Sequence, residues 1–238
     1  MSSPAPGPGA AASVREEHIR VARTARFAVV GADAPGAAEL WIACHGYRQL
    51  ARNFARSFVD VASASRRIIV PEGLSRFYVD DDGGPHGAEA RVGATWMTRE
   101  DRESEIDDYV EYLDALAELV GADDTGPGRL TAFGFSQGAA TASRWAAYGR
   151  TEIDRLILWA GLPAHDLDLD AAATRLAHVD VILAYGTDDA HVTRAAADAA
   201  AASLHEAGVP ARTWPFEGGH RVAAARVADL ARELTAPA

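Results

Sequence analysis

The five residues Gly134-Phe135-Ser136-Gln137-Gly138 lie between a short apolar run, Arg129–Phe135, and an alanine-rich run of helical pattern, 139–148. The order predicts a strand, a sharp turn and a helix. The two flanking glycines permit a strained turn, because a side chain at either position would collide with the neighbouring strand or helix. The Ser136 hydroxyl is then exposed at the sheet edge, and the Gln137 N–H begins the helix without an acceptor. We interpret Ser136 as a nucleophile that attacks acyl carbon.

The composition is that of a single globular domain. The chain has 238 residues, 48% of them hydrophobic and 24% charged, which is enough to bury a continuous core in one α/β domain over residues 15–238. Residues 1–14 are rich in proline, glycine, serine and alanine, and are expected to form a disordered tail and not a secretory signal. With one cysteine, Cys44, and no apolar run of membrane-spanning length, we expect a soluble, cytoplasmic protein.

Charge excludes several kinds of function. The formal net charge is −11, and no cluster of basic residues is visible, so a nucleic-acid partner is not expected. Every basic residue is an arginine. Without lysine, neither Schiff-base chemistry nor the lysine of a nucleotide-binding P-loop is available.

The apolar patterns predict alternating strands and helices. Buried strands are expected at Glu39–Cys44, 67–70, Arg129–Phe135, 156–159, 179–185 and 212–216. Helices are expected at 53–63, 100–120, 139–148, Arg194–Glu206 and 222–234. This alternation predicts an α/β fold with a mostly parallel central sheet covered by helices on both faces.

Two further segments frame this pattern. Residues 15–30 alternate apolar positions and predict a pair of edge strands joined near residues 23–26. Residues 75–98, rich in glycine and aspartate, fit neither periodicity and predict an enlarged loop that forms a lid or cleft wall or is a solvated acidic loop.

A serine nucleophile needs an imidazole base beyond the carboxyl end of a strand. His45, His191 and His220 all follow candidate strands. His220 is favoured, because the preceding Gly218-Gly219 allows a tight path that returns the ring over the sheet. His45 is better explained as a buried strand-end imidazole, and it cannot activate the adjacent Cys44, because neighbouring strand residues point to opposite faces.

The base in turn needs a carboxylate that holds its tautomer. Asp188 and Asp189 both follow the strand 179–185, at the correct edge of the sheet. The chain order Ser, Asp, His is typical of α/β-hydrolases and of neither familiar protease order.

Four sequence blocks carry a resemblance to a known family: His45-Gly46-Tyr47, Gly134-Phe135-Ser136-Gln137-Gly138, Tyr185-Gly186-Thr187-Asp188-Asp189 and Gly218-Gly219-His220. Over about residues 39–234 the chain resembles the phospholipase/carboxylesterase branch of the α/β-hydrolases, which includes acyl-protein thioesterases. The acid of that family ends a five-residue block, which implies Asp189. The resemblance also implies an oxyanion hole made by the backbone N–H groups of Tyr47 and Gln137.

The same resemblance implies a substrate cleft lined by Trp96, with the Tyr47 side chain shaping the acyl pocket, but core packing explains Trp96 equally well. Phe77, in the enlarged loop, is a further candidate for substrate binding. No cofactor is implied. The expected reaction is hydrolysis of a small-molecule carboxylic ester through an acyl-enzyme on Ser136, with a thioester or lysophospholipid as alternative substrate. Peptide hydrolysis is less favoured. A ligand-binding protein that has lost turnover is the alternative of another class, and a homodimer is left open.

A metal site is not expected. His165, Asp166, Asp168 and Asp170 resemble the start of a calcium loop, but the turn glycine is missing and Ala177 stands where the closing glutamate belongs.

Overall fold

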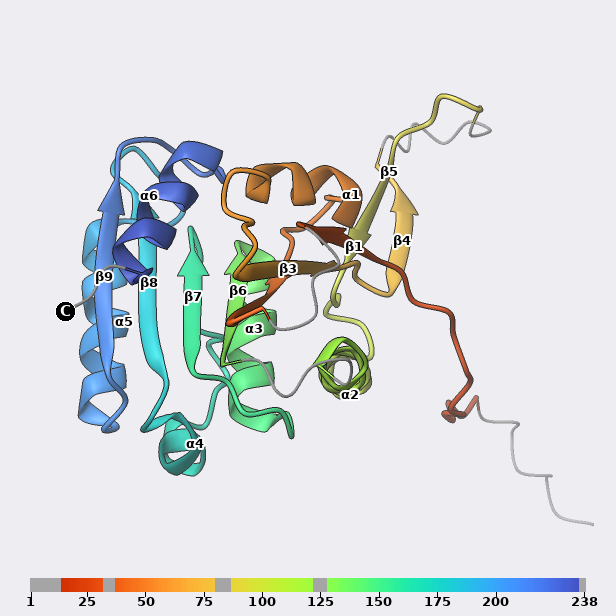
Figure 1. Cartoon of the computed structure of the whole chain (residues 1–238). Helices are drawn as coiled ribbons and strands as arrows, with labels where there is room; N and C mark the ends of the chain where they lie inside the picture. The colour runs from red at the N-terminus through yellow and green to blue at the C-terminus, as the bar shows by residue number, and fades with distance from the viewer. Residues whose placement is uncertain (1–13, 32–36, 80–86, 122–127, 236–238) are drawn as a thin grey trace, which may run out of the picture.

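The computed structural model describes residues 14–31, 37–79, 87–121 and 128–235, and within them a seven-stranded sheet runs in the order β1-β3-β2-β6-β7-β8-β9 (Figure 1). The strands are β1 (Phe27–Val30), β2 (Glu39–Cys44), β3 (Arg66–Pro71), β6 (Arg129–Phe135), β7 (Arg155–Trp159), β8 (Asp180–Gly186) and β9 (Ala211–Phe216). All neighbours are parallel except β1, which pairs antiparallel with β3. The carboxyl ends of the parallel strands therefore meet at one edge.

Helices cover both faces of the sheet. One face packs against α2 (Arg102–Gly121), α3 (Gln137–Tyr148), α4 (Leu169–Leu176) and α5 (Arg194–Glu206), and the other against α1 (Ala51–Phe54), the 3-10 turn η1 (Ala55–Phe58) and α6 (Ala224–Thr235). Figure 1 shows α6 in front of the strands and α5 behind them. Trp145 is fully buried on the first face and Trp41 on the second. The expected α/β fold, with a mostly parallel sheet and helices on both faces, is confirmed.

The predicted N-terminal pair of strands is half wrong. Only β1 forms, while residues 14–26 are not in a strand. Ile19 and Val21 are 86% and 76% exposed. The apolar side chains that alternate along this segment therefore do not pack against the rest of the described protein. Of the tail expected at residues 1–14, only Val14 is among the described residues. The helix expected at 53–63 is the shorter α1 with η1, and α4 was not predicted.

The enlarged loop expected at 75–98 is an antiparallel hairpin at its ends. Strand β4 (Ser75–Tyr78) pairs with β5 (Val92–Thr95) in a small second sheet, while residues 80–86 lie outside the described residues. A side-chain carbon on Gly93 would lie 2.6 Å from the Arg48 carbonyl oxygen. The hairpin therefore packs closely on the loop that follows β2, and glycine is required at this contact.

The long helix α2 is joined to the end of α3 by a buried carboxylate. Asp114 accepts hydrogen bonds from Trp145 Nε1 at 2.9 Å, from the Arg150 and Thr151 N–H groups at 2.7 and 3.0 Å, and from Thr151 Oγ1 at 2.8 Å. Burial on its own raises the pKa of Asp114, but these donors outweigh it and hold the pKa below its usual value. Stabilisation of this kind is present above the unfolded-state pKa of about 3.9 and is lost as pH falls through the folded-state pKa.

Asp114→Ala should lower the free energy of unfolding by about 3 kcal/mol at pH 7, because the buried Trp145 indole and three partly buried donors lose their acceptor. Urea denaturation of wild type and variant measures the difference, and Asp107→Ala, on the exposed side of α2, is the control. The difference should shrink below about pH 4, where the wild-type carboxylate takes up a proton. A pH-independent difference would mean that the loss comes from packing and not from the charged acceptor.

Candidate active site

Ser136 occupies the predicted turn between β6 and α3. Its backbone has φ 52° and ψ −116°, a strained conformation for a residue with a side chain, and its N–H donates to the Trp159 carbonyl at 3.1 Å. A side-chain carbon on Gly134 would lie 2.2 Å from the Gly138 carbonyl oxygen, and one on Gly138 would lie 2.2 Å from that of Cys44. Both flanking glycines are therefore required by close backbone contacts, as the sequence predicted.

His220 and Asp189 lie at the same edge of the sheet as Ser136. His220 Nε2 is 2.9 Å from Ser136 Oγ. The other ring nitrogen, Nδ1, is 3.0 Å from Asp189 Oδ2 and 3.2 Å from Oδ1. The structure thus brings together the three predicted side chains from the ends of β6, β8 and β9, in an arrangement that can relay a proton from the hydroxyl to the imidazole.

Asp189 is fixed and ionised by its surroundings. Its side chain is 0% exposed, and Oδ1 accepts the N–H groups of His191 at 2.7 Å and Val192 at 3.1 Å. Burial on its own raises the pKa of Asp189, but these two hydrogen bonds and the contact with His220 bring it below its usual value. Asp188 is exposed, and its backbone N–H donates to the Gly218 carbonyl. Of the two candidate carboxylates, only Asp189 faces the imidazole.

His45 is the buried imidazole at a strand end that the sequence favoured. His45 is fully buried, with Nδ1 2.8 Å from the Gly46 carbonyl oxygen and Nε2 3.0 Å from the Gly73 nitrogen. Both contacts are satisfied by the neutral ring with its proton on Nδ1. Burial lowers the pKa of His45 and raises that of the Cys44 thiol. His45 thus joins the loop after β2 to the base of the hairpin.

The two proposed oxyanion donors stand on different segments. Gln137 is the first residue of α3, and Tyr47 lies in the turn after β2. In the described parts of the chain, neither backbone N–H has a protein acceptor. Gly46 holds the turn against the strand that leads to the serine, because a side-chain carbon there would lie 2.8 Å from the Phe135 ring. Both N–H groups are therefore free to donate to a further acceptor.

The predicted substrate-binding residues separate into two groups. Tyr47 is 53% exposed and stacks on Phe77 of β4, with ring centroids 5.2 Å apart. Trp96, by contrast, is only 2% exposed and packs against His45 and Tyr109. Of the two explanations left open for Trp96, this burial favours core packing over a place in the cleft wall. Its ring fills space under the loop after β2.

Two further contacts of the site were not predicted. The Gln137 side chain donates from Nε2 to Thr95 Oγ1 and to the Met97 carbonyl, both at 2.9 Å. The His191 ring packs edge-on against His220, with centroids 4.6 Å apart. The position of Gln137 inside the serine motif marks it as a residue of the site, but its side-chain partners are some 40 residues distant in sequence. Only the fold shows them.

The carboxylates of the calcium-like segment have other partners. Asp166 Oδ1 accepts from Arg144 Nε at 3.1 Å and Nη2 at 2.6 Å. Asp168 caps α4 by accepting the Ala171 N–H at 3.0 Å. Among the described residues, no three His, Cys, Asp or Glu side chains gather in a way that suits a metal ion, and no helix is of the length and apolarity needed to cross a bilayer.

Comparison with known proteins fits this geometry. A family model described as "Serine hydrolase (FSH1)" matches residues 42–228. No curated protein matches the sequence.

Similar solved structures include acyl-protein thioesterase 2 of Zea mays, at 18% identity, 89% coverage of this chain, 98% of that chain and a TM-score of 0.63. Esterase PE8 is 20% identical, with 89% of this chain and 99% of that chain covered and a TM-score of 0.59. A Bacillus cereus carboxylesterase is 12% identical, with 88% of this chain and 92% of that chain covered and a TM-score of 0.61. At these identities the likeness shows a shared α/β-hydrolase fold.

Proposed function

The chain belongs to the serine hydrolase (FSH1) family, and we propose that it is a carboxylesterase that forms an acyl-enzyme on Ser136. The observation that carries this proposal is the line of contacts from Asp189 through His220 to Ser136, with separations of 3.0 and 2.9 Å. The matching arrangement on unrelated folds performs acyl transfer, and it is recognised by geometry and not by sequence position.

In the proposed reaction, His220 Nε2 takes the proton of Ser136 as Oγ attacks the ester carbonyl. Asp189 accepts from Nδ1–H, which fixes the tautomer and stabilises the imidazolium. The N–H groups of Tyr47 and Gln137 donate to the oxyanion of the tetrahedral intermediate. As this intermediate collapses, the imidazolium protonates the departing alcohol. Water activated by the same imidazole then releases the carboxylic acid.

The stacked rings of Tyr47 and Phe77 support a small-molecule ester with an apolar acyl group. Tyr47 is exposed on the loop that carries one proposed oxyanion donor, and its ring stacks on the half-buried Phe77 of β4. Apolar substrate groups gain affinity by covering such rings.

An acyl thioester or lysophospholipid is the alternative substrate, since the same residues would release a thiol or a glycerol alcohol, and one structural neighbour is named a thioesterase. A protein that binds ligand without turnover is disfavoured by the contacts of Ser136. We also propose a cytoplasmic location, which suits a chain whose single cysteine is buried and unpaired, and leave a homodimer to be tested by sedimentation.

A fluorophosphonate probe should label wild-type protein, and mass spectrometry should place the adduct on Ser136. The kcat/KM values for 4-nitrophenyl esters from acetate to decanoate, with matched thioesters, then give the preferred acyl length and leaving group. Wild-type protein that neither labels nor hydrolyses any of these compounds would count against catalysis and favour the ligand-binding alternative.

A further inference from the structure

The two proposed oxyanion donors must keep a fixed separation although they come from different parts of the chain. Tyr47 follows β2, and Gln137 begins α3 after β6. An oxyanion hole works only when both N–H groups point at one oxygen position within hydrogen-bond distance. A link between these two segments would therefore act directly on the stabilisation of the transition state.

Trp96 provides such a link. Its indole Nε1 donates to the His45 carbonyl at 2.8 Å, in the loop that carries Tyr47. Its backbone N–H donates to Gln137 Oε1 at 3.3 Å. One buried residue therefore contacts the segment of the first proposed donor and the side chain of the second.

The Gln137 side chain also forms hydrogen bonds with the residues on both sides of Trp96. Its Nε2 reaches Thr95 Oγ1 and the Met97 carbonyl, each at 2.9 Å, while Oε1 accepts the Trp96 N–H. The terminal amide of Gln137 therefore uses both its N–H donors and its oxygen acceptor. The helix residue whose N–H is proposed to hold the oxyanion is thus locked to residues 95–97 through its own side chain.

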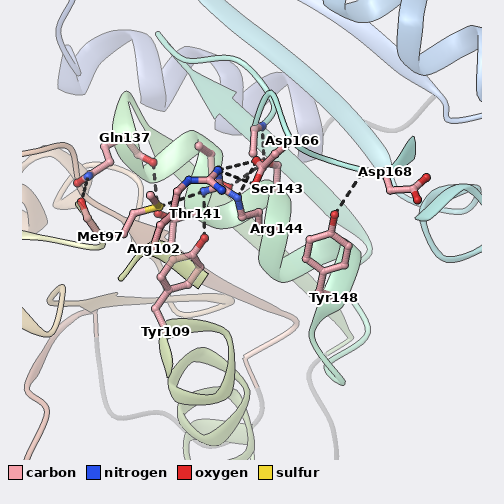
Figure 2. Close-up of polar contacts among 12 residues, drawn as sticks. Met97, Arg102, Tyr109, Gln137, Thr141, Ser143, Arg144, Tyr148, Asp166 and Asp168 are labelled. Carbon is pink, nitrogen blue, oxygen red and sulfur yellow. Dashed lines mark hydrogen bonds and ion pairs between the residues drawn. The ribbon is translucent and has the colours of Figure 1, made fainter. Parts of the chain in front are cut away.

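Residues 95–97 have a second contact with α3, between Met97 and Arg144, two helical turns beyond Gln137 (Figure 2). Arg144 has a side chain that is 4% exposed, and its Nη1 lies 3.6 Å from Met97 Sδ and 3.1 Å from Tyr109 Oη. Asp166 balances the buried guanidinium with two hydrogen bonds, at 3.1 and 2.6 Å. The segment is therefore held against α3 at two points, and its freedom to move relative to the helix is small.

We propose that residues 95–97 form a splint that sets the separation of the two oxyanion donors, with Trp96 and the Gln137 side chain as its positioning residues. The inference rests on the proposed function, because it assigns a purpose to contacts beside Ser136. Neither side chain touches the reacting atoms. Each acts by holding a backbone N–H in place.

Trp96→Phe keeps an aromatic ring at this buried position and removes the indole N–H donor together with part of the ring. It should lower kcat for a good ester substrate by about 10- to 100-fold, approaching the loss caused by removal of an oxyanion donor, with KM changed much less. Trp145→Phe is the matched control, since it removes an indole hydrogen bond of 2.9 Å to Asp114 from another buried tryptophan. The control should lose stability but retain kcat.

Affinity for a trifluoromethyl ketone separates positioning from general loss of structure. The ketone forms a tetrahedral adduct whose oxyanion requires both donors, so its Ki should rise in Trp96→Phe by the same factor by which kcat falls. Gln137→Met, which keeps the backbone N–H, should give a similar loss, and the double variant should be no worse than the poorer single one, because both changes open the same link.

Equal kcat in Trp96→Phe and Trp145→Phe, or an unchanged Ki for the ketone, would overturn the splint. Both comparisons require wild-type protein that hydrolyses the ester. Wild-type protein without labelling or turnover would instead refute the proposed function itself.

Discussion

Replacing Ser136 with alanine is expected to lower kcat for an activated ester by about 10⁴-fold or more. The variant keeps the turn, the helix and the backbone donors, but it has no oxygen in contact with His220 Nε2, which lies 2.9 Å from Oγ in the wild type. Steady-state hydrolysis of the best ester from the chain-length series measures the loss. The same variant should take up no fluorophosphonate.

Ser143→Ala is the matched control for this experiment. Ser143 is buried on the same helix, where its Oγ donates to the Ala140 carbonyl at 2.9 Å and accepts the Ala164 N–H at 3.0 Å. Its replacement should cost stability, because the Ala164 donor loses a partner, but labelling and kcat should stay near wild type. Substantial ester hydrolysis by Ser136→Ala would show that another group carries the reaction.

The strained backbone of Ser136 also has a consequence for stability. A positive φ costs of order 1 kcal/mol or more in a residue with a side chain, and here it is held by the contact of Gly134 with Gly138 and of Gly138 with Cys44. A glycine at position 136 adopts this conformation without strain. Loss of activity in Ser136→Gly together with equal or higher stability is the pattern expected of a residue kept for chemistry.

The sequence predicted the central sheet well because its strands are decided locally. Runs such as Arg155–Trp159 are short, apolar after the first residue and buried over their whole length, and their length and composition identify them. The turn around Ser136 was predicted for a similar reason, since two glycines in fixed positions describe a backbone shape. These features depend on a few adjacent residues.

The errors concern residues whose partners are distant in sequence. Ile19 and Val21 alternate like a strand, but no neighbouring surface covers them. The local pattern left Trp96 open between the cleft and the core, and it lies beneath the loop after β2, where its indole donates to the His45 carbonyl 51 residues away. The pairing of β4 with β5 was missed since Gly93 weakens the strand pattern while satisfying a close contact with Arg48.

Conversion of Asp189 to asparagine should reduce kcat by about 10⁴-fold, a loss of the size seen when the carboxylate of a serine triad becomes an amide. Asp189 accepts His220 Nδ1–H and the N–H groups of His191 and Val192. An amide at this position presents one oxygen and one NH₂ group, so it cannot accept from all three donors. Its NH₂ facing Nδ1 would favour the imidazole tautomer that carries its proton on Nε2, which cannot take the proton of Ser136.

Asp188→Asn separates this effect from a general disturbance of the loop. Asp188 has the same charge and is exposed, and its bond to Gly218 comes from the backbone, so its replacement should leave kcat near wild type. Because hydrogen bonds hold the pKa of Asp189 below its usual value, its carboxylate stays ionised at neutral pH. The difference between the variants at pH 7 and 8 therefore measures loss of charge and geometry and not a shifted titration. Equal losses in the two variants would remove Asp189 from the role proposed for it.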